Sequence, residues 1–171
     1  MHPVSSAEHR ESAAGLTAAC AVLTVSDTRT AETDEGGRRI VEALEAAGHR
    51  VVARALERDE PAAVHARLVE WLAAGTPEVV LTTGGTGIAR RDTTVEVVER
   101  LLDKRIEGFG ELFRMLSFRE VGAAAMLSRA VAGIAGRTAI FALPGSPAAV
   151  RLALEELILP ELPHLLRELR R

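Results

Sequence analysis

The 171-residue sequence contains only one cysteine, so an internal disulfide is excluded. This residue, Cys20, lies in the apolar run 18–25, where we expect a buried and chemically inert thiol. Residues 1–16 include no apolar stretch of signal-peptide length, and no segment reaches the roughly 18 uninterrupted apolar residues of a membrane span. We therefore expect a soluble protein of the reducing cytoplasm that has no membrane partner.

Other shortages exclude whole classes of function. Positive charge is not in excess, since the net charge is -3 and the pI is near 6.0, which argues against a nucleic-acid partner. The five histidines are scattered without metal-ligand spacing, so we expect no zinc site. The sequence also shows no Ser-His-Asp set and no reactive-cysteine setting. Any chemistry would then depend on positioning and charge neutralisation, as in phosphoryl or nucleotidyl transfer.

The hydrophobic pattern predicts an α/β fold. With 47% hydrophobic residues, the length fits a floppy tail over residues 1–16 and one domain over residues 17–171. Apolar runs predict strands that alternate with helices, which indicates a mostly parallel central sheet covered on both faces, a three-layer α/β/α arrangement. The predicted strands cover 18–25, 50–56, 78–82 and 138–143, and the helices cover 35–47, 62–74, a segment starting at Thr93 or Thr94, 110–121, 148–159 and 161–169.

The segment 79–94 carries the clearest functional signal. A buried strand ends there in a loop with three glycines, whose lack of side chains lets a ligand approach the backbone N–H groups. The loop is neither a P-loop nor a dinucleotide fingerprint, because the Lys-Ser/Thr pair and the third spaced glycine are missing. Arg90 and Arg91 add positive charge, and Asp92 adds a carboxylate that suits a metal ion. The sequence predicts an anion site here, with a tight turn that binds no ligand as the alternative.

Other polar residues follow the remaining predicted strands. Ser26 and Asp27 follow the first strand, Asp59 follows the second, and the turn 144–147 follows the strand at 138–143. The carboxyl ends of parallel strands form one crevice, so we expect these loops to meet the glycine loop there. Each is weak by itself, and Asp59 has a competing interpretation as a carboxylate at a helix start.

Five motifs occur in order along the chain: Thr82-Thr83-Gly84-Gly85-Thr86-Gly87, Ala89-Arg90-Arg91-Asp92, Glu107-Gly108-Phe109-Gly110-Glu111, Leu127-Ser128-Arg129 and Pro144-Gly145-Ser146-Pro147. Together they resemble the molybdenum-cofactor biosynthesis family of MoaB and MogA over roughly residues 18–160. The segment 113–118 is most similar to MoaB, whereas 89–92 is similar to the adenylylating MogA branch. Phe109, Leu112, Phe113 and Leu116 recur at helical spacing and are expected to serve the core or an oligomer contact.

The resemblance implies a molybdopterin-binding domain that adenylylates molybdopterin with Mg-ATP. It also implies trimers or hexamers, to which the apolar stripe around Phe113 would contribute. Asp59 and Asp92 match the two functional aspartates of the family and would hold Mg²⁺ against the ATP phosphates. The other expected substrate-binding residues are Ser26, Asp27, Thr83, Gly84, Gly85, Thr86, Gly87, Arg90, Arg91, Pro144, Gly145, Ser146 and Pro147. A pterin-binding paralogue without catalysis and an oligomeric assembly module are the alternatives.

Overall fold

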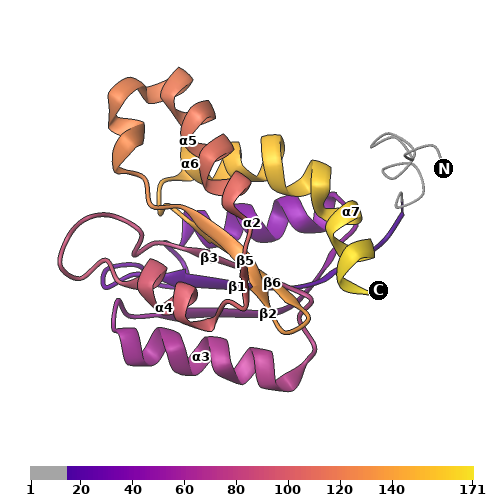
Figure 1. The fold of residues 1–171 in the computed structure, drawn as a ribbon. Coiled ribbons are helices and arrows are strands. Elements are labelled where there is room, and N and C mark those ends of the chain that lie inside the picture. The colour runs from indigo at the N-terminus through magenta and orange to yellow at the C-terminus, as the bar shows by residue number, and fades with distance from the viewer. Residues whose placement is uncertain (1–14) are drawn as a thin grey trace.

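A computed structural model describes residues 15–171, and most of the predicted tail, residues 1–14, lies outside this part (Figure 1). The centre of the fold is a six-stranded sheet with the order β2-β1-β3-β6-β5-β4. The strands are β1 (Ala19–Val25), β2 (Arg50–Glu57), β3 (Val79–Thr83), β4 (Lys104–Arg105), β5 (Val131–Ala135) and β6 (Thr138–Leu143). Strands β2, β1, β3 and β6 are parallel, which confirms the predicted mostly parallel α/β fold.

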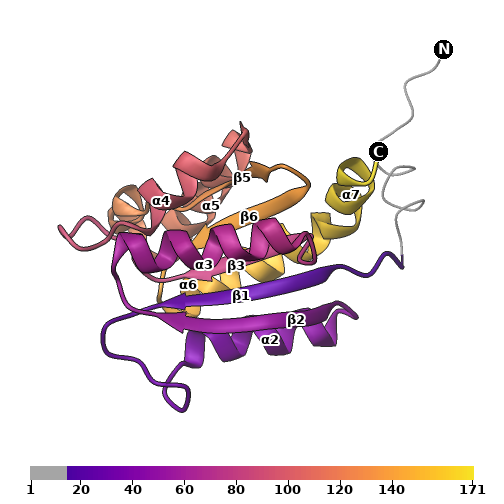
Figure 2. The ribbon, with the colours of Figure 1, turned by 90° about the horizontal axis from the view of Figure 1, so that it is seen from below.

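Helices cover both faces of the sheet (Figures 1 and 2). The lower face in Figure 1 carries α3 (Pro61–Ala74) and α4 (Thr94–Leu101), and the upper face carries α2 (Glu35–Ala46), α5 (Glu107–Val121), α6 (Pro147–Ala153) and α7 (Leu159–Leu169). Within the described residues no helix is long and apolar enough to cross a membrane.

Alternating residues of the central strands fill the two cores between these layers. On β1, Cys20 and Val22 pack in the cluster with α2, α6 and α7, while Ala21 and Leu23 pack in the cluster with α3 and α4. Successive side chains of a strand point to opposite faces, so a strand buried on both faces is apolar throughout. Burial, followed by the charge of Glu78, raises the pKa of the Cys20 thiol to about 12, in keeping with the expected inert thiol.

Strand β5 was not predicted, and neither were the two-residue strand β4 and the 3₁₀ helix η1 (Gly122–Leu127). Strand β5 pairs antiparallel with β6 through a two-residue loop, in which Gly136 has a φ of 59°. Strand β4 is extended only because it pairs with β5. All three elements are short, so the sequence pattern does not reveal them. The two strands are defined by their pairing in the sheet.

The two helices predicted at 148–159 and 161–169 form one continuous helical segment. A π-helical turn, η2 (Leu154–Ile158), joins α6 to α7. Pro160 lies in the first turn of α7, directly after the π-helical turn, and does not end the helical segment.

Phe109 and Phe113 of α5 pack in the core. Phe113 is 1% exposed and its ring stacks on that of Phe109, with 6.2 Å between the centroids. Of the expected stripe, Phe109 and Phe113 are therefore core residues, and only Leu112 is exposed on the surface of this helix. The exposed apolar side chains, each 47–61% accessible, are those of Leu112, Met115, Phe118 and Val121.

A buried carboxylate fixes the start of α2 beside the carboxyl ends of the strands. Asp34 accepts hydrogen bonds from Thr24 Oγ1 (2.8 Å), the Gly37 backbone N–H (2.9 Å) and Arg54 Nη2 (2.8 Å). Burial would raise the pKa of Asp34, but these hydrogen bonds and the charge of Arg54 outweigh it and lower the pKa. The ionised form therefore stabilises the fold.

We expect Asp34→Ala to lower the free energy of unfolding by about 2 kcal/mol, because it removes both a helix cap and a buried ion-pair partner. Asp34→Asn, which can still cap, should cost less. The pKa of Asp34 is lower in the folded state than in the unfolded state. The difference in the free energy of unfolding between wild type and Asp34→Asn should therefore be largest above the unfolded-state pKa, and it should vanish as the pH falls through the folded-state pKa. Urea unfolding at several pH values measures this, with Asp103→Asn as an exposed control, and equal stability of all variants at neutral pH would contradict it.

Candidate functional site

The loops that follow β1, β2, β3 and β6 meet at one edge of the sheet, as predicted. In Figure 2 the arrowheads of β1 and β2 point to this edge. The Ser26 N–H donates to the Glu57 carbonyl (2.9 Å), and the Gly84 N–H donates to the Leu143 carbonyl (3.1 Å). Backbone hydrogen bonds thus join the first loop to the end of β2 and the glycine loop to the end of β6.

Two glycines let the loop after β3 pass through a crowded position. A Cβ on Gly84 would lie 2.1 Å from the Val25 carbonyl oxygen, and its φ is 99°. A Cβ on Gly85 would lie 2.2 Å from Thr94 Oγ1 and 3.1 Å from Asp59 Oδ1, and its φ is 64°. Both positions combine a left-handed backbone with contacts that leave no room for a side chain, so both require glycine.

The glycine loop forms one wall of an open cleft of about 400 Å³. Within the described residues, the backbone N–H groups of Gly85, Thr86, Gly87 and Ile88 have no acceptor. Unpaired amides at the end of a strand can bind an anion. The cleft is lined by Gly84, Gly85, Thr86, Gly87, Asp92, Ala124, Leu127, Ser128, Pro144 and Gly145.

Asp92 lies between this cleft and a second cavity of about 460 Å³. Its Oδ2 accepts the backbone N–H of Ala89 (2.8 Å), which closes a turn within the loop. A Cβ on Gly87 would lie 2.6 Å from the same oxygen, so glycine is needed there to admit the carboxylate.

Asp59 reaches the same loop from the end of β2. Its Oδ1 is buried and has no hydrogen-bond partner. Burial raises the pKa of Asp59, and the charges of Asp92 and Asp27 raise it further, against smaller opposing effects of the Thr93 backbone and Arg91. Like charges at one position favour the protonated form or a bound cation. Asp59 is therefore placed for a role beyond that of a carboxylate at a helix start.

Arg91 links three loops rather than standing free. Its guanidinium donates to Asp27 (3.0 Å), to Glu60 (2.8 Å) and, at 3.4 Å, to the Asp59 carbonyl. Asp27 in turn accepts the Asp59 N–H at 3.3 Å. Hydrogen bonds to both carboxylates raise the pKa of Arg91. Its observed contacts thus neutralise part of the acidic cluster.

Arg90 differs from its neighbour. Within residues 15–171 it makes no hydrogen bond or ion pair, and it lines the 460 Å³ cavity with Asp92, Glu96 and Arg100. Its charge is available to an anion that enters from that side.

The turn 144–147 packs against the glycine loop. A Cβ on Gly145 would lie 3.4 Å from Gly84 Cα, and Thr83 Oγ1 donates to the Pro144 carbonyl (3.0 Å). Ser146 Oγ accepts the Ala149 N–H (3.2 Å) and so caps α6. The expected residues Ser26, Thr83, Gly84, Gly145 and Pro147 also line a small cavity of about 70 Å³.

Two residues of the Leu127-Ser128-Arg129 motif belong to the site, although they were not among the predicted site residues. Ser128 Oγ is buried without a partner and lies in the wall of the cleft. Arg129 donates to the carbonyls of Gly87 (2.8 Å) and Asp92 (2.6 Å). The motif was visible in the sequence, but it precedes β5, which the sequence pattern did not reveal.

Asp59 and Asp92 have the donor chemistry of a magnesium site. Within the described chain, no group of three or more His, Cys, Asp and Glu residues is placed to hold a metal. Asp59 and Asp92 interact electrostatically, and Asp59 Oδ1 lacks a partner. Mg²⁺ is commonly held by one or two carboxylates together with water and substrate phosphates, which this arrangement allows.

Comparison with known proteins defines the family. Residues 21–164 match the model of a "Probable molybdopterin binding domain". The chain is a member of the molybdopterin-binding family. It is 54% identical over 153 residues to molybdenum cofactor biosynthesis protein B of Staphylococcus carnosus, covering 88% of this chain and 89% of the relative.

Solved structures agree with this assignment to the molybdopterin-binding family. The crystal structure of a molybdenum cofactor biosynthesis protein B superimposes with a TM-score of 0.89 at 48% identity, over 92% of this chain and 99% of that one. A structure of MogA superimposes with a TM-score of 0.81 at 35% identity, over 88% and 99%. The fold is thus shared with both branches.

We expect Asp59→Asn to raise the melting temperature at neutral pH by a few degrees, because it removes an ionised group that burial and two neighbouring carboxylates disfavour. Ionised Asp59 destabilises the wild type fully above its raised folded-state pKa, and this destabilisation disappears below its unfolded-state pKa. The gain should therefore fade as the pH approaches 3.8, the ordinary value. Calorimetry across this range is the measurement, and Asp103→Asn is the control. A lower melting temperature for Asp59→Asn at neutral pH would oppose this account.

Proposed function

We propose that this protein adenylylates molybdopterin with Mg-ATP. The observation that carries the proposal is the placement of Asp59 and Asp92 against one loop that presents unpaired backbone amides. A site for phosphates needs donors for their oxygens, and nucleotidyl transfer also needs carboxylates for the accompanying cation. Both are combined at this edge of the sheet.

The transfer is an in-line substitution at phosphorus. A terminal phosphate oxygen of the pterin forms a bond to the α-phosphorus of ATP, and the bond from that phosphorus to the bridging oxygen breaks. Pyrophosphate leaves with the bonding electrons. The chain supplies the amides of residues 85–88 and the positive charge of Arg90 to the phosphate oxygens, while Ser128 Oγ offers a hydroxyl within the cleft.

Asp59 and Asp92 would hold Mg²⁺. When bound, the ion neutralises the phosphates of ATP and stabilises the charge on the leaving pyrophosphate. The Asp92 turn with Ala89 keeps one carboxylate oxygen inside the loop, so the other is the atom available to a cation.

A pterin-binding protein that transfers no AMP is the second candidate. Its support is the 54% identity to a molybdenum cofactor biosynthesis protein B, beside the 35% identity to MogA. This candidate predicts pterin binding without release of pyrophosphate.

We also propose that the chain assembles into a trimer or hexamer through the outer face of α5. This face exposes Leu112, Met115, Phe118 and Val121, and α5 rises away from the sheet (Figure 1). The apolar surface continues through Leu127 of η1, which also lines the cleft. Contiguous exposed apolar surface of this kind is typical of a subunit interface. If the protein instead served as an assembly module, the same α5 face would bind the other proteins.

Incubation with molybdopterin and Mg-ATP should yield adenylylated pterin and pyrophosphate. Asp92→Asn should slow the transfer by about a hundredfold or more, since a charged group at the phosphates is lost. The asparagine oxygen can still accept the Ala89 N–H, so pterin binding should change little. Asp103→Asn, whose carboxylate accepts the Gly136 N–H far from the site, is the matched control. Pterin binding by wild type with no product would reject the transferase in favour of the second candidate.

Sedimentation velocity should show a trimer or hexamer for the wild type. Phe118→Glu places a charge on the α5 face and should shift the protein to monomer without a loss of melting temperature beyond that of dissociation. Val69→Glu, at an exposed apolar residue of α3, should leave the assembly unchanged. A monomeric wild type, or an intact oligomer of Phe118→Glu, would refute the α5 interface.

A further inference from the structure

We infer that Arg129 is a positioning residue that aims the backbone amides of Gly87 and Ile88 into the phosphate cleft. The inference deepens the proposed function and rests on it for the nature of the anion, a phosphate group of the pterin or nucleotide. Arg129 itself does not line the cleft. It acts through the backbone of the glycine loop.

The guanidinium of Arg129 binds the loop at its middle and at its end. Its Nε donates to the Gly87 carbonyl at 2.8 Å and, more weakly, to the Thr86 carbonyl at 3.4 Å. Its Nη2 donates to the Asp92 carbonyl at 2.6 Å. One planar guanidinium therefore ties the amide cradle to the backbone of Asp92.

Peptide geometry then sets the direction of the amides. In a trans peptide the C=O and the following N–H point in opposite directions, and the described chain has no cis peptides. The carbonyls of Thr86 and Gly87 are turned to Arg129, so the N–H groups of Gly87 and Ile88 point away from it. These N–H groups have no acceptor among the described residues.

The cavities around the loop agree with this direction. Arg129 lines the 460 Å³ cavity beside α4 and a cavity of about 400 Å³ beside α5, and neither of these is the cleft. The cleft is lined by residues 84–87 and the turn after β6. Gly87, whose carbonyl accepts from Arg129, lines the cleft, so its own N–H is placed to face it. The exposed Ile88 lines the 460 Å³ cavity with Arg129, so for Ile88 the direction of the N–H follows from the peptide geometry.

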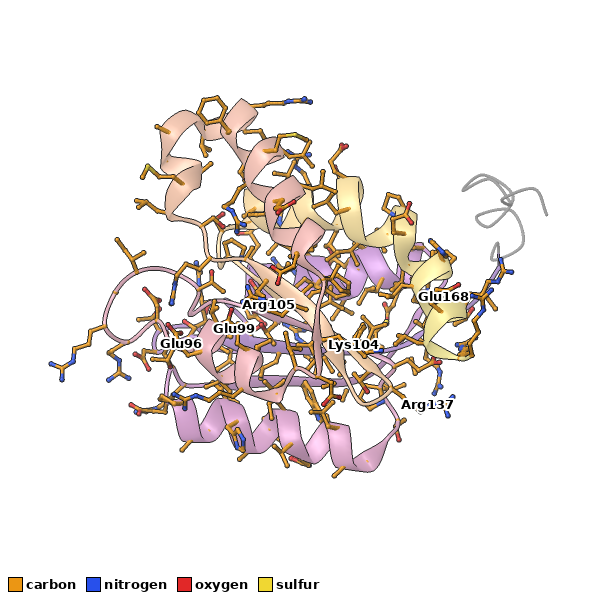
Figure 3. The ribbon with its side chains drawn as sticks, viewed as in Figure 1. Glu96, Glu99, Lys104, Arg105, Arg137 and Glu168 are labelled. Atoms are coloured by element: carbon orange, nitrogen blue, oxygen red, sulfur yellow. The ribbon has the colours of Figure 1, made fainter. Side chains whose placement is uncertain are left out.

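Glu96 holds Arg129 in this orientation. Thr93 and Glu96 have capping-box spacing, but the Thr93 side chain caps nothing, and Glu96 instead pairs with Arg129 Nη1. Glu96 lies on α4 near the loop edge of the sheet (Figure 3). Burial would raise the pKa of Glu96, yet the hydrogen bond and charge of Arg129 lower it, so the pair stays ionised. A planar guanidinium can satisfy carbonyls and a carboxylate at the same time, which a lysine ammonium cannot.

The test uses the full-length protein and inorganic pyrophosphate as the probe. Arg129→Gln should weaken pyrophosphate binding, measured by calorimetry, by about tenfold, the scale of losing one to two aligned hydrogen bonds to an anion. Hydrogen exchange should become faster in residues 86–92, and the NMR amide shifts of Gly87 and Ile88 should change. Arg129→Lys should behave like Arg129→Gln.

Arg67→Gln is the matched control. Arg67 also makes ion pairs, to Glu57 and Glu70, and its side chain is 32% exposed against 30% for Arg129. It should leave pyrophosphate binding and the loop amides unchanged, whatever it does to stability. A loss of melting temperature in Arg129→Gln with wild-type affinity and unchanged loop amides would show a merely structural role and overturn the inference.

Measurement of AMP transfer by the same proteins separates this inference from the proposed function. Arg129-dependent binding of pyrophosphate by a wild type that transfers no AMP would reject the transferase and keep the positioning role. AMP transfer by wild type, with binding independent of Arg129, would keep the transferase and reject the positioning role. If wild type does not bind pyrophosphate, the cradle and this inference both fail.

Discussion

The site depends on the close approach of the loop after β3 to the ends of its neighbours. Gly84 lies against the Val25 carbonyl, and Gly85 lies against Thr94 and Asp59. An added Cβ would lie 2.1 Å from the Val25 carbonyl oxygen or 2.2 Å from Thr94 Oγ1, so a side chain would separate the loop from β1 or from α4. The cleft, the free amides and the meeting of the two aspartates all follow from this one approach.

The carboxylates beside the glycine loop repel one another, which lowers the stability of the fold there. Asp59 has a raised pKa because burial and the carboxylates of Asp92 and Asp27 oppose its ionisation. Arg91 offsets part of this repulsion through Asp27 and Glu60. By contrast, Asp34 at the start of α2 is fully hydrogen-bonded, and its pKa is lowered. The first arrangement suits a bound cation, while the second holds the fold together.

The molecule separates its ligand-binding edge from its exposed apolar face, yet η1 touches both. Leu127 is half exposed and also lines the cleft. An assembly built on α5 would therefore cover part of the surface beside the cleft. In the proposed assembly this short 3₁₀ segment, which the sequence pattern alone did not indicate, would couple subunit contact to ligand access.

The sequence by itself determined the parallel α/β fold, the loop edge and most of the cleft wall. Continuous apolar strands and clustered glycines are local signals, and the expected Gly84, Gly87 and Asp92 all lie in the cleft. Only the tertiary structure decided what the arginines do. Arg91 meets Asp27, 64 residues away, and Arg129 meets the Gly87 carbonyl, 42 residues away. The partners of a long charged side chain depend on which loops pack beside it, and strands β4 and β5, which place Arg129, exist only through that packing.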